Sequence, residues 1–410
     1  MANSKELVPT NSVWSPGFTE ELLPTSKQIS LLYHISYLCL AKFPNLERLL
    51  RKRAVETQLL FGSSEALLLK CMGISQTLVS SLFPMLIHAI EKNKPTLAVK
   101  YLEKARTWID ELIADVDKMV QSYVQHNEDV ATTTSDIITE KANTEAKSEQ
   151  LSKEVQEMEG AIKTLEEKLA GVRNELEDTK RKIDAKNLEL ESYVRDVTSK
   201  SSGLGIFAAI VPFIGPIVKS IYDAATSPAA AAKIKALENQ LNQLTSQKTA
   251  LMNQQWSIEV QQIDLQMKLA KVKIDKGSIP SPVHLNEVQR YLTKIQNILI
   301  QIKNFWQKVH SMLGVMQKKT FVNEDLVDEP ELKEEFVNSI QKASEIWSNF
   351  GGSCGKAAEI FKIQSKDAYA FLEIDPSSLS DAVWQEEYNS VMGQLQEMKV
   401  LNQTPAAIQN

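Results

Sequence analysis

The stretch GLGIFAAIVPFIGPIVKSIYDAATSPAAAA, Gly203–Ala232, is an apolar segment between two strongly charged segments. It has no charged residue over Ser201–Val218. So much apolar surface is unfavourable in water and must be buried in protein or in lipid. Pro212, Gly215 and Pro216 interrupt the segment near its centre, because proline removes a helical hydrogen-bond donor and clashes with the preceding turn. The segment is therefore predicted to form a hairpin.

Both flanks of the apolar segment carry a coiled-coil pattern. Apolar residues recur at alternating spacings of four and three over residues 151–183, and the same spacing returns over residues 234–272. The two seams lie at similar distances from the apolar turn. The pattern predicts an antiparallel helical hairpin of residues 151–200 and 233–276, which carries residues 201–232 at its tip.

Three residues of the second seam are polar where apolar side chains would pack better: Lys248, Gln255 and Gln262. A buried polar layer can fix the register of a coiled coil, and the same residues can also simply meet solvent. Both interpretations stay open from the sequence.

The remaining residues predict a helical bundle. Only 14 glycines and 14 prolines occur in 410 residues, which favours few, long helices. Residues 1–24 are interpreted as an irregular leader, 25–150 with 277–400 as the tail bundle, and 401–410 as a frayed tail. The fold class is therefore all-α: an elongated helical bundle (tail) with a long antiparallel coiled-coil hairpin (neck) that carries an apolar head.

Local signals refine this bundle. No proline occurs between Pro95 and Pro212, so one helix over residues 95–199 is predicted, about 157 Å long at 1.5 Å per residue. Pro84 predicts a kink. The GGSCG sequence at residues 351–355 indicates either a helix break or a close helix contact.

Composition argues against several classes of protein. The net charge is −6 and basic residues alternate with acidic ones, so no nucleic-acid partner is expected. Cys39, Cys71 and Cys354 lack CxxC spacing, which favours buried free thiols over a zinc site or a disulfide framework.

Catalytic and cofactor motifs are also missing from the sequence. The five histidines show no HxxxH or HExxH pairing, and neither a Walker A loop nor a GxSxG motif occurs. The GLG at residues 203–205 follows no predicted strand, so it does not indicate dinucleotide binding. We expect no enzyme activity, no metal and no cofactor.

The expected location follows from two further observations. The N-terminal sequence MANSKELVPTNSVW lacks a basic region followed by an apolar one, so no cleaved secretory signal is expected. No uninterrupted apolar helix of membrane-spanning length is expected either, which predicts a soluble resting form.

The apolar segment has two competing interpretations: a buried core hairpin, or a membrane-engaging head. Membrane engagement is favoured, because two-helix arms with charged backs leave little protein to bury such a tip. Tyrosine and lysine at its borders are residue types favoured at membrane interfaces. The predicted interface anchors are Tyr193, Lys200, Lys219 and Tyr222. The predicted membrane-engaging residues are Leu204, Ile206, Phe207, Ile210, Val211, Pro212, Phe213, Ile214, Pro216, Ile217 and Val218.

A tail bundle, a long helical hairpin and the GLGIFAAIVPFIGPIV head together resemble the cytolysin A type of α-helical pore-forming toxins. The likeness is to the A component of the binary xenorhabdolysin family and covers the layout of the whole chain, without a short signature motif. The chain also looks like the haemolysin BL and non-haemolytic enterotoxin components, although the lack of a secretory signal counts against that branch.

The resemblance implies a secreted toxin subunit that is soluble before it reaches a target host-cell membrane. It implies target membrane lipid and a second, B-type component as partners, with the pairs assembling into a hetero-oligomeric ring. In that family the A head sits shallowly and B supplies the spanning helix. Two other classes remain as alternatives: an intracellular coiled-coil scaffold, or a lipid-surface remodelling protein.

Overall fold

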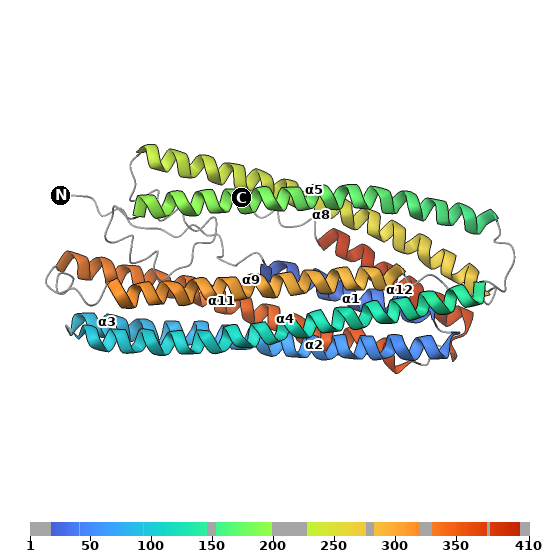
Figure 1. Ribbon diagram of the computed structural model, residues 1–410, viewed down its shortest axis with the longest axis horizontal. Helices are drawn as coiled ribbons and strands as arrows, with labels where there is room; N and C mark the ends of the chain where they lie inside the picture. The colour runs from blue at the N-terminus through green and yellow to red at the C-terminus, as the bar shows by residue number, and fades with distance from the viewer. Residues whose placement is uncertain are drawn as a thin grey trace.

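The computed structural model of the protein describes residues 18–40, 42–92, 94–145, 153–198, 228–275, 283–319, 330–374 and 378–401. Every regular element within these ranges is a helix, so the predicted all-α class is confirmed. The helices of the N-terminal part are α1 (Phe18–Cys39), α2 (Pro44–Thr77), the π-helical turn η1 (Leu78–Leu82), α3 (Phe83–Glu91) and α4 (Pro95–Glu145). The rest are α5 (Lys153–Thr198), α8 (Pro228–Asp275), α9 (Val283–Lys319), α11 (Pro330–Lys366), the 3₁₀ helix η3 (Asp367–Glu373) and α12 (Asp381–Leu401), as Figure 1 shows.

Helix α1 begins earlier than predicted. Residues 18–24 are helical and Pro24 lies inside the helix, so this part of the predicted irregular leader is wrong. Leu22 is buried in the core, and its burial favours the helical turn despite the hydrogen bond that Pro24 cannot donate.

The predicted disturbance at Pro84 is present as a π-helical turn over Leu78–Leu82, directly before the proline. A wider turn relieves the clash between a proline ring and the carbonyl four residues earlier. The run Pro44–Glu91 around it is long and apolar enough to cross a membrane by length and composition, with 44% of its apolar window buried. The expectation that no such helix occurs is therefore wrong by that criterion. The run packs along α11 and α4 in the bundle.

The bundle core is rich in aromatic side chains. Phe305 and Trp306 of α9 meet Trp347 and Phe350 of α11, with ring centroids 4.8 to 5.8 Å apart. Edge-to-face and tilted arrangements of this kind add to the stabilisation from buried area. Helix α9 also packs on α4 and α1, which places it centrally in the bundle as its two apolar faces predicted.

The single long helix predicted for residues 95–199 is wrong. Asn127 of α4 donates a hydrogen bond to Thr293 of α9 over 2.8 Å, and Arg173 of α5 lies 3.0 Å from Glu287 of the same helix. In one straight helix, residues 127 and 173 would be about 69 Å apart, yet they meet positions of α9 that are only about 9 Å apart. The chain therefore reverses between α4 and α5, as Figure 1 shows.

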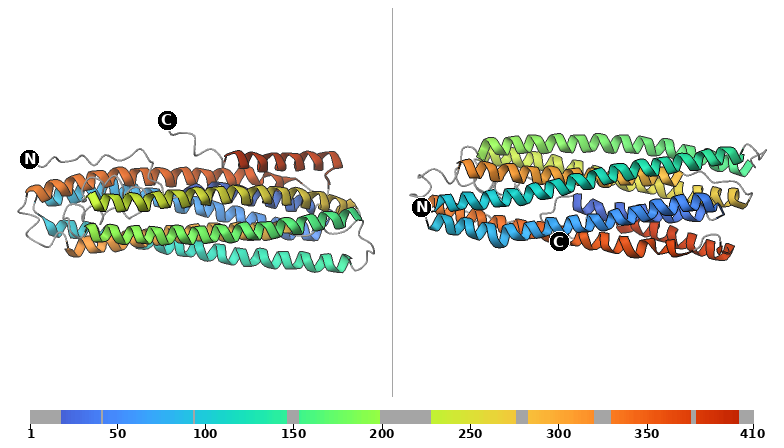
Figure 2. Two further views of the ribbon diagram at one scale, coloured as in Figure 1. Left: turned by 90° about the horizontal axis from the view of Figure 1, so that it is seen from above. Right: turned by 60° about the horizontal axis from the view of Figure 1, so that its bottom comes forward.

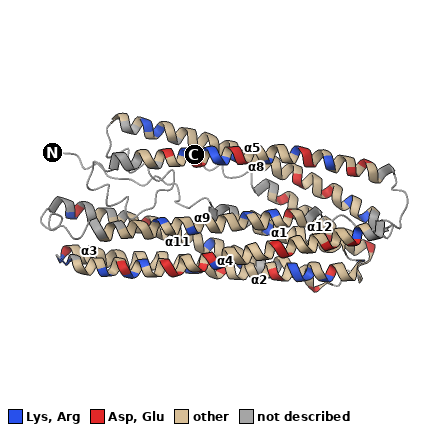
Figure 3. Ribbon diagram, in the orientation of Figure 1, with Lys and Arg blue, Asp and Glu red and all other residues tan. Residues whose placement is uncertain are grey.

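As a result, the α5–α8 hairpin lies alongside the rest of the bundle and parallel to its long axis. Figure 2 shows this arrangement from two further sides. Acidic and basic residues alternate along the helices in Figure 3, and no continuous basic stripe is visible on the part of the chain drawn in colour. The division into tail, neck and head stays a prediction.

Candidate membrane-engaging site

The predicted head falls between α5 and α8. Helix α5 ends at Thr198 and α8 begins at Pro228. All the predicted membrane-engaging residues lie between these helices and outside the described residues: Leu204, Ile206, Phe207, Ile210, Val211, Pro212, Phe213, Ile214, Pro216, Ile217 and Val218. Three of the predicted anchors, Lys200, Lys219 and Tyr222, lie outside them as well, so only Tyr193 has a described position.

The two ends of the apolar segment are held together by the helices that flank it. Lys233 Nζ of α8 lies 4.3 Å from the ring centroid of Tyr193 on α5. Leu190 and Ile234 beside them are buried. A cation over an aromatic face is attracted to the ring, which adds to the apolar contact. The described helices thus place both ends of the apolar segment at one end of the hairpin.

The seam below this end follows the predicted pattern. Val155 and Ile162 of α5 form one buried cluster with Leu269 of α8, and Val172 and Leu176 form another with Leu251. Since the residue number rises along α5 while that of its partner falls along α8, the two helices are antiparallel, as predicted. Both clusters are separate from the main core.

The polar seam residues behave differently from one another. Gln262 is buried and donates a hydrogen bond across the seam to Glu166 Oε1 over 3.4 Å, which suits a register-setting layer. Gln255 is partly exposed and donates to Glu259 on its own helix over 2.7 Å. The sequence left these two roles open, and the structure assigns the first to Gln262.

A buried cluster of charges joins the hairpin to the bundle, and we call it the hairpin clasp: Arg173 of α5, Glu259 of α8, and Glu287, Arg290 and Tyr291 of α9. Arg173 Nη2 lies 3.4 Å from Glu259 Oε1 and 3.0 Å from Glu287 Oε1. Arg290 forms ion pairs with both carboxylates, and the Tyr291 hydroxyl donates a hydrogen bond to Glu259 Oε2. Each carboxylate therefore has cationic partners, as buried charges require.

Burial controls the acid–base behaviour of the hairpin clasp. It raises the pKa of Glu259 above its usual range despite hydrogen bonds from Tyr291 and Gln255. Burial, together with the negative charge of Glu259, raises the pKa of Glu287 to about 7. The pKa of the Tyr291 hydroxyl is raised for the same reasons, so it stays protonated and can donate. The hairpin clasp is thus most favourable when its carboxylates share a proton.

The other contacts between the hairpin and the bundle come from α8. Tyr388 of α12 donates to Asp264 over 2.6 Å, and Lys271 donates to Gln385 over 3.1 Å. Lys271 also lies over the ring of Trp384. Cys39 Sγ of α1 lies 3.6 Å from Met267 Sδ. Polar contacts of this kind can be exchanged for water at lower cost than an apolar core.

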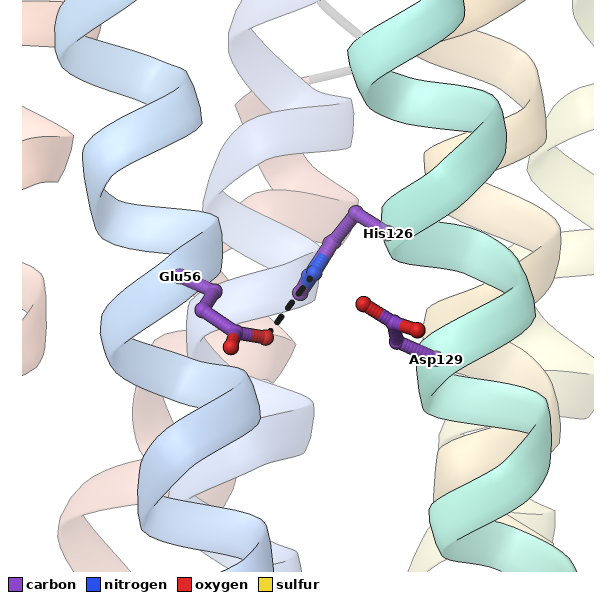
Figure 4. Close-up of side chains that lie close together, drawn as sticks. All are labelled: Glu56, His126 and Asp129. Carbon is purple, nitrogen blue, oxygen red and sulfur yellow. Dashed lines mark ion pairs between the residues drawn. The ribbon is translucent and has the colours of Figure 1, made fainter.

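A second buried polar cluster lies in the bundle, between α2 and α4, and Figure 4 shows three of its members. Ligand atoms of Glu56, His126 and Asp129 lie within 4.8 Å of one another, a donor set that suits a metal. Arg53 Nη1, however, lies 2.7 Å from Glu56 and 3.0 Å from Asp129. A metal would have to displace this buried guanidinium, so Arg53 serves as the cation of the cluster.

His126 in this cluster is neutral at pH 7. Burial, with the nearby Arg53 charge, lowers its pKa to about 4. Its Nε2 lies 2.6 Å from Thr57 Oγ1, which in turn lies 3.0 Å from the Tyr33 hydroxyl. The cluster is a hydrogen-bonded part of the core and contacts neither the hairpin clasp nor the seam in the contacts described above.

Neither the hairpin clasp nor the Arg53 cluster was predicted from the sequence. Their residues stand on charged helices, where most acidic and basic side chains are exposed. The sequence offers one faint signal, the tyrosine at position 291 beside a glutamate and an arginine at helical spacing, Glu287 and Arg290. Only the packing of α5, α8 and α9 shows that these groups are buried.

Comparison with known proteins gives weak structural likenesses. No protein-family model matches the chain, and no curated protein matches it in sequence. Among solved structures it is similar to soluble SmhA of the tripartite α-pore-forming toxin Smh from Serratia marcescens, at 12% identity, over 88% of this chain and 97% of that chain, with a TM-score of 0.44.

Two further similar structures are toxin proteins or come from the same comparison. The Bacillus cereus HblL1 toxin component is 12% identical over 87% of this chain and 99% of its own, with a TM-score of 0.39. PaxB from Photorhabdus luminescens is 13% identical over 80% of this chain and 97% of its own, with a TM-score of 0.23. At such scores the likeness is too weak to assign a function, and the proposal for this chain rests on its own residues.

Proposed function

We propose that this chain is a subunit of an α-helical pore-forming toxin, soluble until its apolar head engages a target membrane. The proposed head is residues 201–232. It acts with a second component that supplies the spanning helix, and the pairs assemble into a hetero-oligomeric ring. Secretion uses a route other than a classical signal peptide.

One observation supports this proposal above the others. The two helices that flank an uncharged, apolar stretch are paired antiparallel, and their ends meet where Lys233 covers Tyr193. An apolar segment is thereby placed at the end of a helical hairpin. An intracellular scaffold would use the same seam but gives no role to this segment.

The length of the head favours shallow insertion. The limb from Gly203 to Val211 would reach only about 14 Å as a helix, against about 30 Å for the hydrocarbon core. Pro212 and Pro216 each disfavour a continuous helix by about 3 kcal/mol. Unpaired backbone groups at such a turn are costly in hydrocarbon, so the turn rests near the headgroups or against a partner.

The folded-back hairpin adds a condition to this proposal. The hairpin has its own seam, and its contacts with the bundle include the charged groups of the hairpin clasp. For the head to reach a membrane away from the bundle, these contacts must open while the seam stays closed.

The test follows flotation and dye release together on vesicles of phosphatidylcholine and phosphatidylserine. We expect the full chain to float with the vesicles while releasing little dye, and release to appear when a second protein encoded beside it is added. Efficient release by the chain alone, at concentrations where it has only just bound, would show that it forms the pore unaided.

A head variant tests the site itself. Phe207→Asp with Ile210→Asp should abolish flotation, because each apolar side chain contributes about 1.5 to 3 kcal/mol on leaving water and a charge in hydrocarbon reverses the sign. The matched control is Leu188→Asp, a substitution at a side chain of α5 that is 64% exposed. A double variant that unfolds, with a wild type that never floats, would instead make the segment part of the core.

A further inference from the structure

Two of the three cysteines lie opposite each other where α2 and α11 pack. Ser75 of α2 donates a hydrogen bond to the Trp347 carbonyl of α11, and the rings of Phe61 and Phe361 meet at 5.3 Å. Because the partner number rises on α11 as the residue number falls on α2, the helices are antiparallel. This register brings Cys71 of α2 level with Cys354 of α11.

Glycine allows the two helices to approach closely at this level. A Cβ atom at Gly351 would lie 3.3 Å from Ser75 Oγ, and one at Gly355 would lie 3.0 Å from Met72 Sδ. Cys354 stands between these two glycines, and Cys71 precedes Met72. The GGSCG sequence therefore marks a close helix contact and not a helix break, since α11 is continuous through it.

The environment of the pair differs from that of the third cysteine. Cys71 and Cys354 are both buried, and the Cys71 thiol is a hydrogen-bond neighbour of the Cys354 thiol, which together with burial raises the pKa of Cys354. Cys39 has Met267 as its sulfur neighbour instead, and burial raises its pKa to about 12. A disulfide requires Cα atoms about 4.4 to 6.8 Å apart, a spacing that close helix contacts at glycine favour.

We propose that Cys71 and Cys354 are a site of covalent modification, at which an oxidising disulfide converts the two thiols into a cross-link between α2 and α11. This inference goes beyond the proposed toxin function and does not depend on it. The expected oxidant class is a small-molecule disulfide such as oxidised glutathione, as found outside the reducing cytosol.

The chemistry balances in two exchange steps. One cysteine thiolate attacks oxidised glutathione, forms a mixed disulfide and displaces one glutathione thiolate. The second cysteine thiolate then attacks the protein sulfur of that mixed disulfide and displaces the other glutathione. The two thiol protons end on the two glutathione molecules. Because both thiols are buried, the oxidant reaches them while the chain opens or folds, so the cross-link forms faster during refolding than in the native protein.

The cross-link would constrain the unfolded chain without touching the hairpin. The chain between the two cysteines contains α4, α5, α8 and α9, and closing a long loop lowers the entropy of the unfolded state. Neither cysteine lies on α5 or α8. We therefore expect a higher urea midpoint for the oxidised protein than for the reduced one, with no effect on release of the hairpin.

The experiment refolds the full chain from urea in a buffer of oxidised and reduced glutathione, then counts free thiols and maps peptides by mass spectrometry. We expect one free thiol per chain and a peptide that joins the Cys71 and Cys354 segments, in the wild type and in Cys39→Ser, which should retain none. Cys71→Ser and Cys354→Ser should form no intramolecular cross-link. Three free thiols after refolding, or a cross-link that includes Cys39, would overturn the proposal, and the wild-type map decides it even where a serine variant folds poorly.

Discussion

The hydroxyl of Tyr291 on α9 donates a hydrogen bond to the Glu259 carboxylate of α8, a side chain only 3% exposed. A carboxylate at this depth is unfavourable unless it is paired and hydrogen-bonded. The partners of Glu259 come from α8 itself, from α5 and from α9. This contact therefore exists only while the hairpin lies against the bundle, and it couples the hairpin's position to the burial of a charge.

Removal of Arg173 should weaken this attachment. We expect Arg173→Ala to lower the free energy of unfolding by about 2 to 3 kcal/mol, because it leaves two buried carboxylates with fewer cationic partners. Urea denaturation followed by circular dichroism measures the change. Arg181→Ala is the matched control on the same helix: Arg181 and Glu177 are both largely exposed and 4.0 Å apart, so its effect should stay within about 0.5 kcal/mol. Equal losses in the two variants would show that Arg173 behaves as a surface residue.

Stability should fall as the pH rises through neutrality. The pKa of Glu287 is raised to about 7 in the fold from an ordinary value near 4.5, so the folded protein holds this proton more tightly than the unfolded chain does. Its contribution is complete below pH 4.5 and is lost as the pH rises through 7, with a slope of at most about 1.4 kcal/mol per pH unit for one proton.

The variant Glu287→Gln isolates this effect. Urea unfolding of both proteins between pH 5 and 8 should show a difference in stability that changes with pH, because the variant has lost the titrating carboxyl. Contributions common to both proteins, such as that of the buried His126, cancel in this difference. Parallel curves over the whole range would mean that Glu287 does not titrate in the fold.

The hairpin could be predicted from the sequence because its signal is local. Val155, Ile162 and Leu269 fall on a four-and-three repeat that needs no knowledge of distant residues, and they meet as that repeat requires. The reversal between α4 and α5 carries no such signal, since residues 146–152 contain neither glycine nor proline. Glu259 could not be told from an exposed glutamate, because its burial depends on α9, which lies elsewhere in the chain. The positions of the predicted head residues, such as Phe207, lie outside what the structure describes.

Two adjacent glycines of α11 should respond oppositely to alanine. A Cβ at Gly352 meets nothing within 4 Å, so Gly352→Ala should stabilise the protein by about 0.5 to 1 kcal/mol through helix propensity. At Gly351 the added Cβ would lie 3.3 Å from Ser75 Oγ, which is itself fixed by its hydrogen bond to Trp347. We expect Gly351→Ala to be less stable than Gly352→Ala by about 1 kcal/mol or more. Urea denaturation decides this, and equal gains at both positions would contradict the close helix contact.

A cross-link between the hairpin and the bundle should block membrane engagement. Cys39 Sγ of α1 lies 3.6 Å from Met267 Sδ of α8, so Met267→Cys places a second thiol beside a native one. Oxidation of this variant should join α8 to α1. If the head must leave the bundle to reach lipid, the oxidised variant should neither float with vesicles nor support dye release with its second component, and a reducing agent should restore both.

The control for this cross-link is Met267→Cys with Cys39→Ser, which carries the same change in the core but cannot join the two helices. Cys71 and Cys354 are present in both proteins, so their oxidation state affects both alike. The control should float equally well before and after reduction. If the oxidised, cross-linked variant floats and releases dye as the reduced one does, the hairpin engages lipid without leaving the bundle, because a covalent bond between α1 and α8 would then not oppose the reaction.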